Sequence, residues 1–355
     1  MSTDYLRLYE KDSDSDAAYY LSHGGIYYYI SNSDKYSLKG QNFIIGASEL
    51  IMSKAIGQPV LRQETVLLDK DACVKKIPSD KFYESLNQFS FIMNLSMVIA
   101  RQVVLTNKII QENRKLLTAE SKSPQQVCLE YYKIISVILE EYEKRKLPWL
   151  KEILSKYHAS LVFKKGEIYF KTAQPVKIES AASFSDKMIE YPKSAVIFSQ
   201  GELGREMFIL QRGSVEVLIG DTRVAVIDEP GSAIGEIALL LGENRSATLR
   251  AMNNVVLTKI SQKDLKDISG SGSPLFFEIA KSLSQKHINN IASIHSINES
   301  VISRNLGFDD EELRKKKQND QRAEMELSSL KKVISDAFFK KDAFFLKERI
   351  GDLID

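Results

Sequence analysis

A segment near the start of the chain recurs in its second half, and this internal repeat limits the possible fold more than any other feature of the sequence. Residues 18–50 align with residues 207–239 without a gap, at an offset of 189 positions that pairs Gly46 with Gly235. Self-similarity at a long fixed spacing is typical of one structural unit used more than once. The sequence therefore predicts two copies of one fold, separated by a different segment.

The repeat continues beyond this stretch at a smaller offset. Residues 62–82 align with residues 245–265 at an offset of 183 positions, which pairs Arg62 with Arg245. The first copy thus holds six extra residues before its arginine, the difference between the two offsets. We expect these extra residues to lie in a loop.

The second copy has the pattern of a series of short strands. Val, Ile and Phe are frequent between residues 195 and 236, and turn dipeptides interrupt them at Gln200-Gly201, Arg212-Gly213, Gly220-Asp221 and Pro230-Gly231. This rhythm indicates an antiparallel sandwich or barrel rather than alternating strands and helices. From about residue 275 to residue 302 the apolar spacing becomes helical, at Leu283, Ile288, Ile291, Ile294, Ile297 and Val301.

The segments outside the two copies have helical patterns. An amphipathic stretch that begins near Pro124 is broken at Pro148, and the apolar residues after about residue 308 again follow helical spacing. We therefore expect an α+β chain with two jelly-roll-like β-barrels and flanking helices, joined by a helical spacer and followed by a helical tail. The expected domains are residues 1–112 and 181–302 for the two copies, 113–180 for the spacer and 303–355 for the tail.

Composition excludes several classes of protein. The chain has 355 residues, of which 43% are hydrophobic, so it can build substantial cores. Its net charge of +2 does not favour a nucleic-acid or membrane partner. Its two cysteines, Cys73 and Cys128, fit a reducing compartment. No signal-peptide pattern or membrane-spanning run is visible, so we expect a soluble, cytoplasmic protein.

One stretch of the second copy places two opposite charges among small and apolar residues. Glu236 follows Gly235, five apolar residues come next, and Arg245 lies nine positions after the acid. A glycine lets a ligand approach the backbone, and an arginine offers a planar fork of donors to an anion. A carboxylate beside a phosphate is favourable only if it faces a neutral donor, and a ribose hydroxyl is such a donor. The stretch predicts a site for a ribose with a single phosphate.

The same stretch, "IGEIALLLGENRSAT", resembles the phosphate-binding cassette of the cyclic nucleotide-binding domain family, usually written F-G-E-[LI]-A-L-[LI]…R-x-A-[TS]; Ile234 replaces the aromatic residue. The resemblance implies that Glu236 binds the ribose 2′-hydroxyl and Arg245 the cyclic phosphate. It also implies that backbone amides near Ile237, Ala238 and Ser246 complete the phosphate shell and that Val217 and Ala225 line the base. The implied ligand-binding residues are Gly235, Glu236, Ile237, Ala238, Arg245, Ser246, Ala247, Val217 and Ala225.

The first copy differs from the second at positions that matter for this chemistry. Ala47 stands where the second copy has its acid, and Glu64 lies near the expected phosphate. Arg62 is either a remnant or an ion-pair partner of Glu64 or Glu49. We therefore expect a degenerate copy, kept for scaffolding or regulatory contact, that binds no cyclic nucleotide.

The sequence has no recognisable catalytic or metal-binding pattern. The four histidines (His23, His158, His287 and His295) are scattered, and we expect the last two on the surface of a helix. We expect a non-enzymatic receptor without cofactor or metal, which signals to a partner when the helix after residue 275 moves over the base as a lid. Ser246 resembles bacterial cAMP receptors, so cAMP is favoured over cGMP.

Alternative functions stay open at this point. A transcription regulator of the catabolite-activator type needs a helix-turn-helix after the long helix, and residues 307–355 offer no compact three-helix pattern. A kinase regulatory subunit fits the tandem copies, but no inhibitor segment of the RRxS type precedes the first copy. A ligand-free assembly scaffold, or self-association of a receptor, would use the apolar residues of the tail: Leu327, Val333, Phe338 and Phe345.

Overall fold

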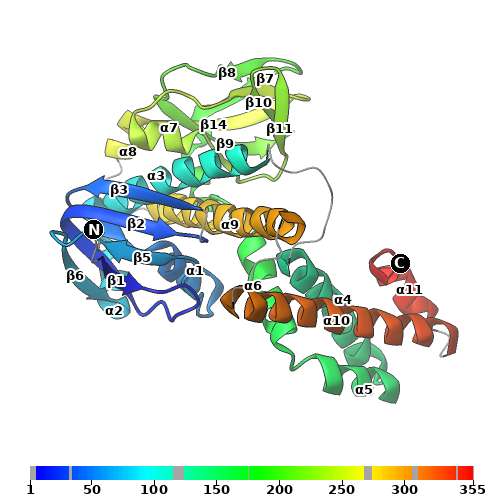
Figure 1. The fold of residues 1–355 in the computed structure, drawn as a ribbon. Helices are drawn as coiled ribbons and strands as arrows, with labels where there is room; N and C mark the ends of the chain where they lie inside the picture. The colour runs from blue at the N-terminus through cyan, green and yellow to red at the C-terminus, as the bar shows by residue number, and fades with distance from the viewer. Residues whose placement is uncertain are drawn as a thin grey trace. The chain divides into compact units, whose positions relative to one another are not determined.

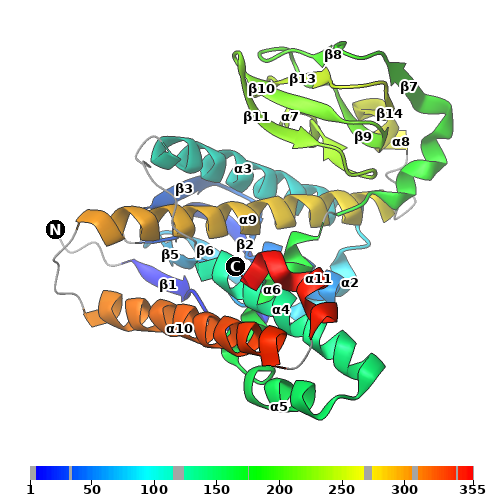
Figure 2. The ribbon, with the colours of Figure 1, turned by 90° about the vertical axis from the view of Figure 1, so that its right-hand side faces the viewer.

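The fold is described from a computed structural model, in which the chain divides into two units (Figures 1 and 2). The structure describes residues 5–31, 34–114, 124–174, 176–267, 274–305, 311–340 and 343–354. The first unit contains residues 1–109 and 175–291, and the second contains residues 110–174 and 292–355. The first unit holds both halves of the sequence repeat, and the second is helical.

The C-terminal half of the first unit contains two four-stranded sheets, ordered β11-β10-β13-β8 and β12-β9-β14-β7, whose strands pair antiparallel. Its strands are β7 (Met188–Tyr191), β8 (Val196–Phe198), β9 (Glu206–Arg212), β10 (Val215–Ile219), β11 (Thr222–Ile227), β12 (Ala233–Ile234), β13 (Thr248–Ala251) and β14 (Val255–Ser261). Its helices are α7 (Glu236–Leu241), α8 (Gln262–Asp267) and α9 (Pro274–Asn305), preceded by the 3₁₀ segment η1 (Glu179–Lys187). The glycines of the four predicted turns all have positive φ, which a glycine adopts without strain.

The N-terminal half contains six strands around the long strand β2, which pairs antiparallel with four others. The strands are β1 (Leu6–Tyr9), β2 (Ala17–Tyr29), β3 (Lys35–Gly40), β4 (Phe43–Ile45), β5 (Thr65–Leu68) and β6 (Cys73–Pro78). The helices are α1 (Ser48–Ile56), α2 (Ser79–Ser85) and α3 (Phe89–Arg114). Antiparallel sheets combined with helices confirm the mixed α and β class.

The strand registers of the two halves coincide at the offsets found in the sequence. Tyr28 pairs with Tyr36 between β2 and β3, and Val217 pairs with Ala225 between β10 and β11, 189 positions later in each case. β5 and β13 likewise begin 183 positions apart. Part of the six-residue insertion lengthens a helix, because α1 has nine residues and α7 has six. The prediction that the insertion lies wholly in a loop is therefore wrong.

A continuous hydrophobic core fills the first unit. It contains buried residues of both halves, including Ile51 and Leu95 from the N-terminal half and Leu239 and Leu283 from the C-terminal half. The helices α3 and α9 lie side by side (Figures 1 and 2), and the Asn290 amide donates hydrogen bonds to the Thr106 hydroxyl and the Asn107 side chain. The repeated halves therefore share this core, and the C-terminal half also has a cluster of its own that includes Phe208 and Leu257.

The second unit packs helices from the predicted spacer against helices from the predicted tail. Its complete helices are α4 (Pro124–Arg145), α5 (Pro148–Tyr157), α6 (Leu161–Ala173), α10 (Glu311–Lys340) and α11 (Phe344–Ile354). Gly166 of α6 lies against the Cys128 carbonyl of α4, where a side chain would collide. Arg349 of α11 forms ion pairs with Glu140 and Glu141 of α4, at 2.6 and 2.8 Å. Spacer and tail residues thus form one unit, whereas the sequence predicted two.

The apolar tail residues that were candidates for docking a partner contribute to the core of this helical unit. Leu327 is buried in that core, and Val333, Phe338 and Phe345 pack against it. Burial against α4, α5 and α6 explains their helical spacing. These four side chains are therefore used inside the chain, and the alternative that they form an assembly surface loses its basis.

Among the described residues, one helix segment, residues 89–113 of α3, is long and apolar enough to span a membrane. The sequence analysis predicted no such segment. Half of its most apolar window is buried inside the structure, and its buried residues include Ile92, Leu95 and Ile99 of the hydrophobic core. Its apolar character is that of a core helix.

Candidate functional site

The predicted ligand-binding stretch is built around a glycine and an arginine. Gly235 has φ +78° and precedes α7, and a Cβ at this position would lie 2.5 Å from Nη1 of Arg245. Only glycine therefore allows the arginine to pack against the backbone here. We call residues 235–248 the C-terminal cassette.

Arg245 is fixed by two backbone carbonyls. Its Nη1 donates to the Gly235 carbonyl at 2.8 Å, and its Nη2 donates to the Glu206 carbonyl at 2.6 Å. The guanidinium also lies over the ring of Phe198, 4.2 Å from its centre. The side chain is only 4% exposed, and its Nε has no hydrogen-bond partner among the described residues. A buried donor without a partner is unusual, so this arginine keeps capacity for an anion.

The charges around Arg245 act in opposite directions. Burial lowers the pKa of Arg245, whereas the carboxylates of Glu206, Glu202 and Glu236 raise it. The predicted acid and the predicted cation of the site are therefore close enough to interact. Both flank Gly235, as the sequence predicted.

Glu236 is buried and paired with a lysine that the sequence analysis did not identify. Glu236 is only 1% exposed, and its Oε1 accepts a hydrogen bond from Nζ of Lys286 at 2.5 Å. Lys286 belongs to α9 and also donates to the Ala233 carbonyl at 3.2 Å. A ligand hydroxyl that binds this carboxylate must either share it with Lys286 or displace Lys286.

The remaining predicted residues lie on β10, β11 and α7 and directly after Arg245. Val217 and Ala225 face each other across β10 and β11, and Ala225 is exposed. Ser246 is exposed and Ala247 is half-buried after the arginine. Ile237 is half-buried and Ala238 is buried in α7. The base-lining positions thus carry little bulk.

The N-terminal half holds an arginine in the same way. We call residues 46–65 the N-terminal cassette. Arg62 donates from Nη1 to the Gly46 carbonyl at 2.8 Å and from Nη2 to the Ala17 carbonyl, and it lies over the ring of Tyr9. Gly46, Ala17 and Tyr9 each precede their counterparts at Arg245 by 189 positions. Arg62 is 0% exposed, and its Nε likewise lacks a partner among the described residues.

A carboxylate from the chain itself lies beside this second arginine. Glu49 Oε2 accepts from Arg62 Nη1 at 3.4 Å, and Glu49 Oε1 accepts from the Gln63 backbone N–H at 3.3 Å. The counterparts of these two donors are Arg245 and the Ser246 amide, which the resemblance assigns to the phosphate shell. Of the two partners that the sequence suggested for Arg62, the ion pair is with Glu49.

Large side chains fill the space that is lined by small ones in the C-terminal half. Tyr28 and Tyr36 stand at the positions of Val217 and Ala225, and their rings stack with centres 4.6 Å apart. Both tyrosines are buried, as is Glu64. Burial and the charge of Glu49 raise the pKa of Glu64 well above its usual range.

His287 of α9 completes this buried group. Gln102 donates to the Tyr36 hydroxyl, which donates to Glu64. The Nε2 of His287 lies 3.1 Å from the same hydroxyl, and its Nδ1 lies 3.1 Å from the Ser48 hydroxyl, both within hydrogen-bond distance. Burial lowers the pKa of His287 to about 3, so the ring is neutral. The prediction that His287 lies on the helix surface is wrong, because it is 1% exposed.

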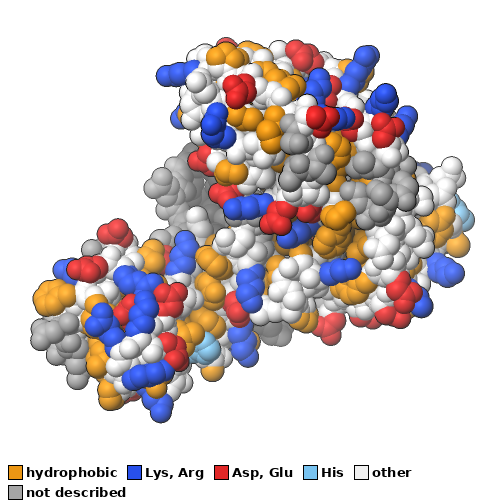
Figure 3. All heavy atoms as spheres, turned by 180° about the vertical axis from the view of Figure 1, so that it is seen from behind, with side chains coloured by type: hydrophobic (Ala, Val, Ile, Leu, Met, Phe, Trp, Pro, Cys, Tyr) orange, Lys and Arg blue, Asp and Glu red, His pale blue; other side chains and the backbone are white. Residues whose placement is uncertain are grey.

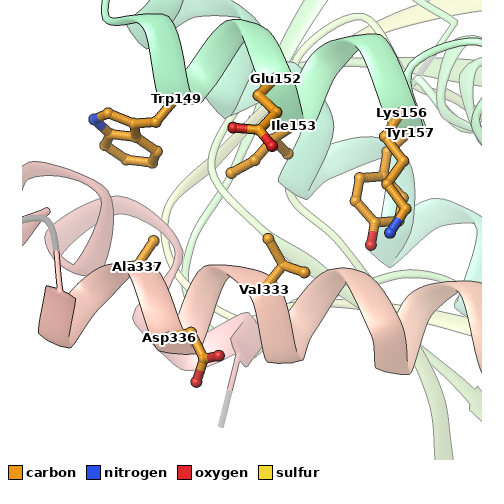
Figure 4. A pocket seen from close by; sticks show the side chains of 8 residues that line it. All are labelled: Trp149, Glu152, Ile153, Lys156, Tyr157, Val333, Asp336 and Ala337. Carbon is orange, nitrogen blue, oxygen red and sulfur yellow. The ribbon is translucent and has the colours of Figure 1, made fainter.

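A separate cavity lies in the helical unit between α5 and α10 (Figure 4). Its volume is about 250 Å³, and Trp149, Ile153, Tyr157, Val333 and Ala337 provide most of its wall. Glu152 and Lys156 also line it, together with Asp336. These residues include no nucleophile–base pair, and the cavity suits apolar contact rather than chemistry.

Charges and metal ligands indicate no further site among the described residues. No group of three or more His, Cys, Asp or Glu side chains that could hold a metal ion occurs among them. On the face seen in Figure 3, the coloured Lys and Arg side chains are interspersed with Asp and Glu. Mixed signs of this kind give no continuous basic surface on that face for a nucleic acid.

Comparisons with known proteins place the C-terminal cassette in context. The family model described as "Cyclic nucleotide-binding domain" matches residues 188–270. The "Cyclic AMP receptor protein" of Thermus thermophilus is 30% identical over 104 residues, which are 28% of this chain and 48% of that protein. The "cGMP-dependent protein kinase" of Toxoplasma gondii is 39% identical over 71 residues, which are 20% of this chain and 7% of that protein.

A solved structure described as "cAMP bound PfPKA-R (141-441)" is 16% identical, covers 76% of this chain and 72% of that chain, and has a TM-score of 0.25. The chain spans less than half the length of the two curated relatives.

Proposed function

Because residues 188–270 belong to the cyclic nucleotide-binding domain family, we propose that this chain is a non-enzymatic receptor for a 3′,5′-cyclic nucleotide. The ligand binds the C-terminal cassette, with Arg245 on the cyclic phosphate and Glu236 on the ribose 2′-hydroxyl. The shell is completed by Gly235, the backbone near Ile237, Ala238 and Ser246, and the side chains of Ala247, Val217 and Ala225. No cofactor or metal takes part.

The observation that carries this proposal is that Arg245 lies close to the acid Glu236, whereas the N-terminal half has a matching arginine but Ala47 in place of the acid. Two backbone carbonyls hold the guanidinium beside Gly235, and its buried Nε has no partner among the described residues. A charge-assisted hydrogen bond to a phosphate would satisfy this donor. The residues that the resemblance assigns to the base, Val217 and Ala225, pair with each other across β10 and β11 and carry small side chains.

We propose in addition that the N-terminal half is a degenerate copy of the same fold that binds no cyclic nucleotide. Glu49 already supplies an anion to Arg62 and to the Gln63 amide. Tyr28 and Tyr36 occupy the positions of the base-lining residues. A cyclic phosphate would bring a second negative charge beside Glu49 in a buried place, which is strongly unfavourable.

Ligand binding moves α9, the lid helix, and this movement signals to a protein partner. The favoured ligand is cAMP, because of Ser246.

The compartment that we propose is the cytoplasm, which the sequence analysis also expected. A DNA-binding function has less support, because the tail residues after the lid helix contribute to a helical core with α4, α5 and α6.

Calorimetric titration of the full chain tests the proposal. We expect saturable binding of cAMP, weaker binding of cGMP, and much weaker binding of 5′-AMP, which has the same base and ribose but a doubly charged, open phosphate. Absence of saturable binding for all cyclic nucleotides, including cyclic dinucleotides, would overturn it. A tighter fit for cGMP would correct only the choice of base.

A further inference from the structure

Two neighbouring side chains of α9 reach the two cassettes. Lys286 donates to Glu236 of the C-terminal cassette at 2.5 Å. The next residue, His287, forms hydrogen bonds with Ser48 of the N-terminal cassette and with Tyr36, both at 3.1 Å. Successive residues of a helix point about 100° apart, so one turn of α9 contacts two different partners.

The partners of these two side chains occupy related positions in the two halves. Glu236 is the proposed ribose ligand, and Ser48 aligns with Ile237, the residue next to it. Tyr36 aligns with Ala225, a proposed base-lining residue. The helix α9 therefore contacts the proposed ribose ligand Glu236 in the C-terminal half and residues at related positions, Ser48 and Tyr36, in the N-terminal half.

The contacts of His287 cannot be released without movement of the α9 backbone, whereas the Lys286 side chain is 39% exposed and can also rotate toward solvent. His287 is buried and makes two side-chain hydrogen bonds, so it has no free rotamer into solvent. One turn later, Asn290 is hydrogen-bonded to Thr106 and Asn107 of α3, the last helix of the N-terminal half. A shift of α9 at Lys286 therefore disturbs the contacts of His287 as well.

We propose that Lys286 and His287 form a latch between the two cassettes, so that nucleotide binding at Glu236 displaces Lys286 while α9 moves over the base, and this movement of α9 withdraws His287 from Tyr36 and Ser48. The proposal rests on the proposed function for its trigger, but the latch itself exists without ligand. Opening the latch exposes a polar surface formed by Tyr36, Ser48 and Glu64. The N-terminal half then reports the state of the C-terminal site.

Hydrogen–deuterium exchange on the full chain without nucleotide tests the latch directly. Lys286→Met keeps most of the length of the side chain but removes the ammonium group that donates to Glu236, and His287→Ala removes the other contact. Because coupling between sites is reciprocal, each variant should loosen the cassette it does not touch. We expect exchange to rise about fivefold or more, the low end of known couplings, at residues 35–50 in Lys286→Met and at residues 233–241 in His287→Ala.

Lys281→Met is the matched control, because Lys281 lies on the same helix and makes no ion pair with the described residues. If each variant loosens only the cassette that it contacts, or neither, the latch is overturned. This result does not depend on nucleotide, so failure to bind cAMP would count against the proposed function alone. With cAMP added to the unmodified chain, faster exchange at residues 35–50 supports the latch, and unchanged exchange despite binding contradicts it.

Discussion

The two cassettes share an arginine and the backbone that holds it, but they differ in what occupies the space beside it. In the C-terminal half, the facing residues of the two strands are Val217 and Ala225. In the N-terminal half, the same register brings together Tyr28 and Tyr36, whose buried rings stack. The first arrangement carries small side chains at these two positions, and the second carries two stacked aromatic rings.

This difference separates the structural role of the arginine from its role in binding. Arg62 and Arg245 each join the carbonyl of a glycine to the carbonyl of a distant strand, and both therefore stabilise the fold. Such an arginine can persist where no ligand binds. The capacity to bind depends on the neighbouring positions, which are Glu236 and small residues in one cassette, and Ala47 and large residues in the other.

The largest effect that we expect comes from removing Arg62, the arginine of the N-terminal cassette. Arg62→Ala leaves Glu49 without its buried partner, and loss of one member of a buried pair costs about 3–5 kcal/mol of unfolding free energy. Chemical denaturation measures the loss. Arg7→Ala is the control, because the exposed pair of Arg7 with Glu10 contributes at most about 1 kcal/mol. Equal losses in both variants would contradict the comparison.

Arg245, the arginine of the C-terminal cassette, should instead determine the affinity for cAMP. Arg245→Lys keeps the charge but loses the planar fork that donates to two carbonyls and faces the phosphate. A lost charge-assisted hydrogen bond of about 1.5–3 kcal/mol weakens cAMP binding by about 10- to 100-fold, which calorimetry measures. Arg250→Lys, which changes an arginine paired with Glu216 in the same half, should bind as the unmodified chain does. If Arg62→Lys weakened binding as much as Arg245→Lys, the N-terminal cassette would be the site.

Local patterns predicted much of this comparison from the sequence. The glycines at Gly201, Gly213, Gly220 and Gly231 all adopt positive φ, so the turn rhythm gave correct strand boundaries. The gapless alignment predicted which residues occupy matching register positions, because side-chain direction in paired strands follows from register alone. The position of Glu236 and Arg245 beside Gly235 follows from the same local chemistry.

The contacts made by α9 could not be predicted in this way. Lys286 meets Glu236 across 50 positions of sequence, and His287 meets Ser48 across 239. Helical spacing shows which residues share a face, but it does not show which distant element covers that face. The same limit explains why the spacer and the tail were predicted as separate segments.

Glu236, the acid of the C-terminal cassette, should distinguish ligands that have a 2′-hydroxyl from ligands that lack it. With the unmodified chain, 2′-deoxy-cAMP should bind about tenfold more weakly than cAMP, because a hydrogen bond to a charged acceptor contributes about 1.5 kcal/mol. In Glu236→Ala the two ligands should bind equally, whatever the change in overall affinity. Calorimetry with both ligands on both proteins isolates the pairwise term. A preference for cAMP that survives in Glu236→Ala would remove the acid from the ribose.

The smallest effect that we expect is a change in the free energy of unfolding with pH, caused by His287, which contacts the N-terminal cassette. Burial lowers the pKa of His287 from 6.5 to about 3, so between these values the unfolded chain binds a proton that the folded chain excludes. Stability from this group is therefore complete above pH 6.5 and is lost as the pH falls toward 3. Between pH 6.5 and 5.5 the loss is about 1 kcal/mol.

His287→Gln should remove this contribution, because an amide does not take up a proton in the window. Glu64 works in the opposite direction, since its raised pKa makes the folded chain bind more protons than the unfolded chain. It is present in both proteins, and Tyr36 stays neutral because burial raises its pKa. The difference in unfolding free energy between the two proteins at pH 6.5 and at pH 5.5 therefore isolates the histidine. Parallel stability curves would mean that His287 is not excluded from water in the folded chain, and the N-terminal cassette would then be open like its counterpart.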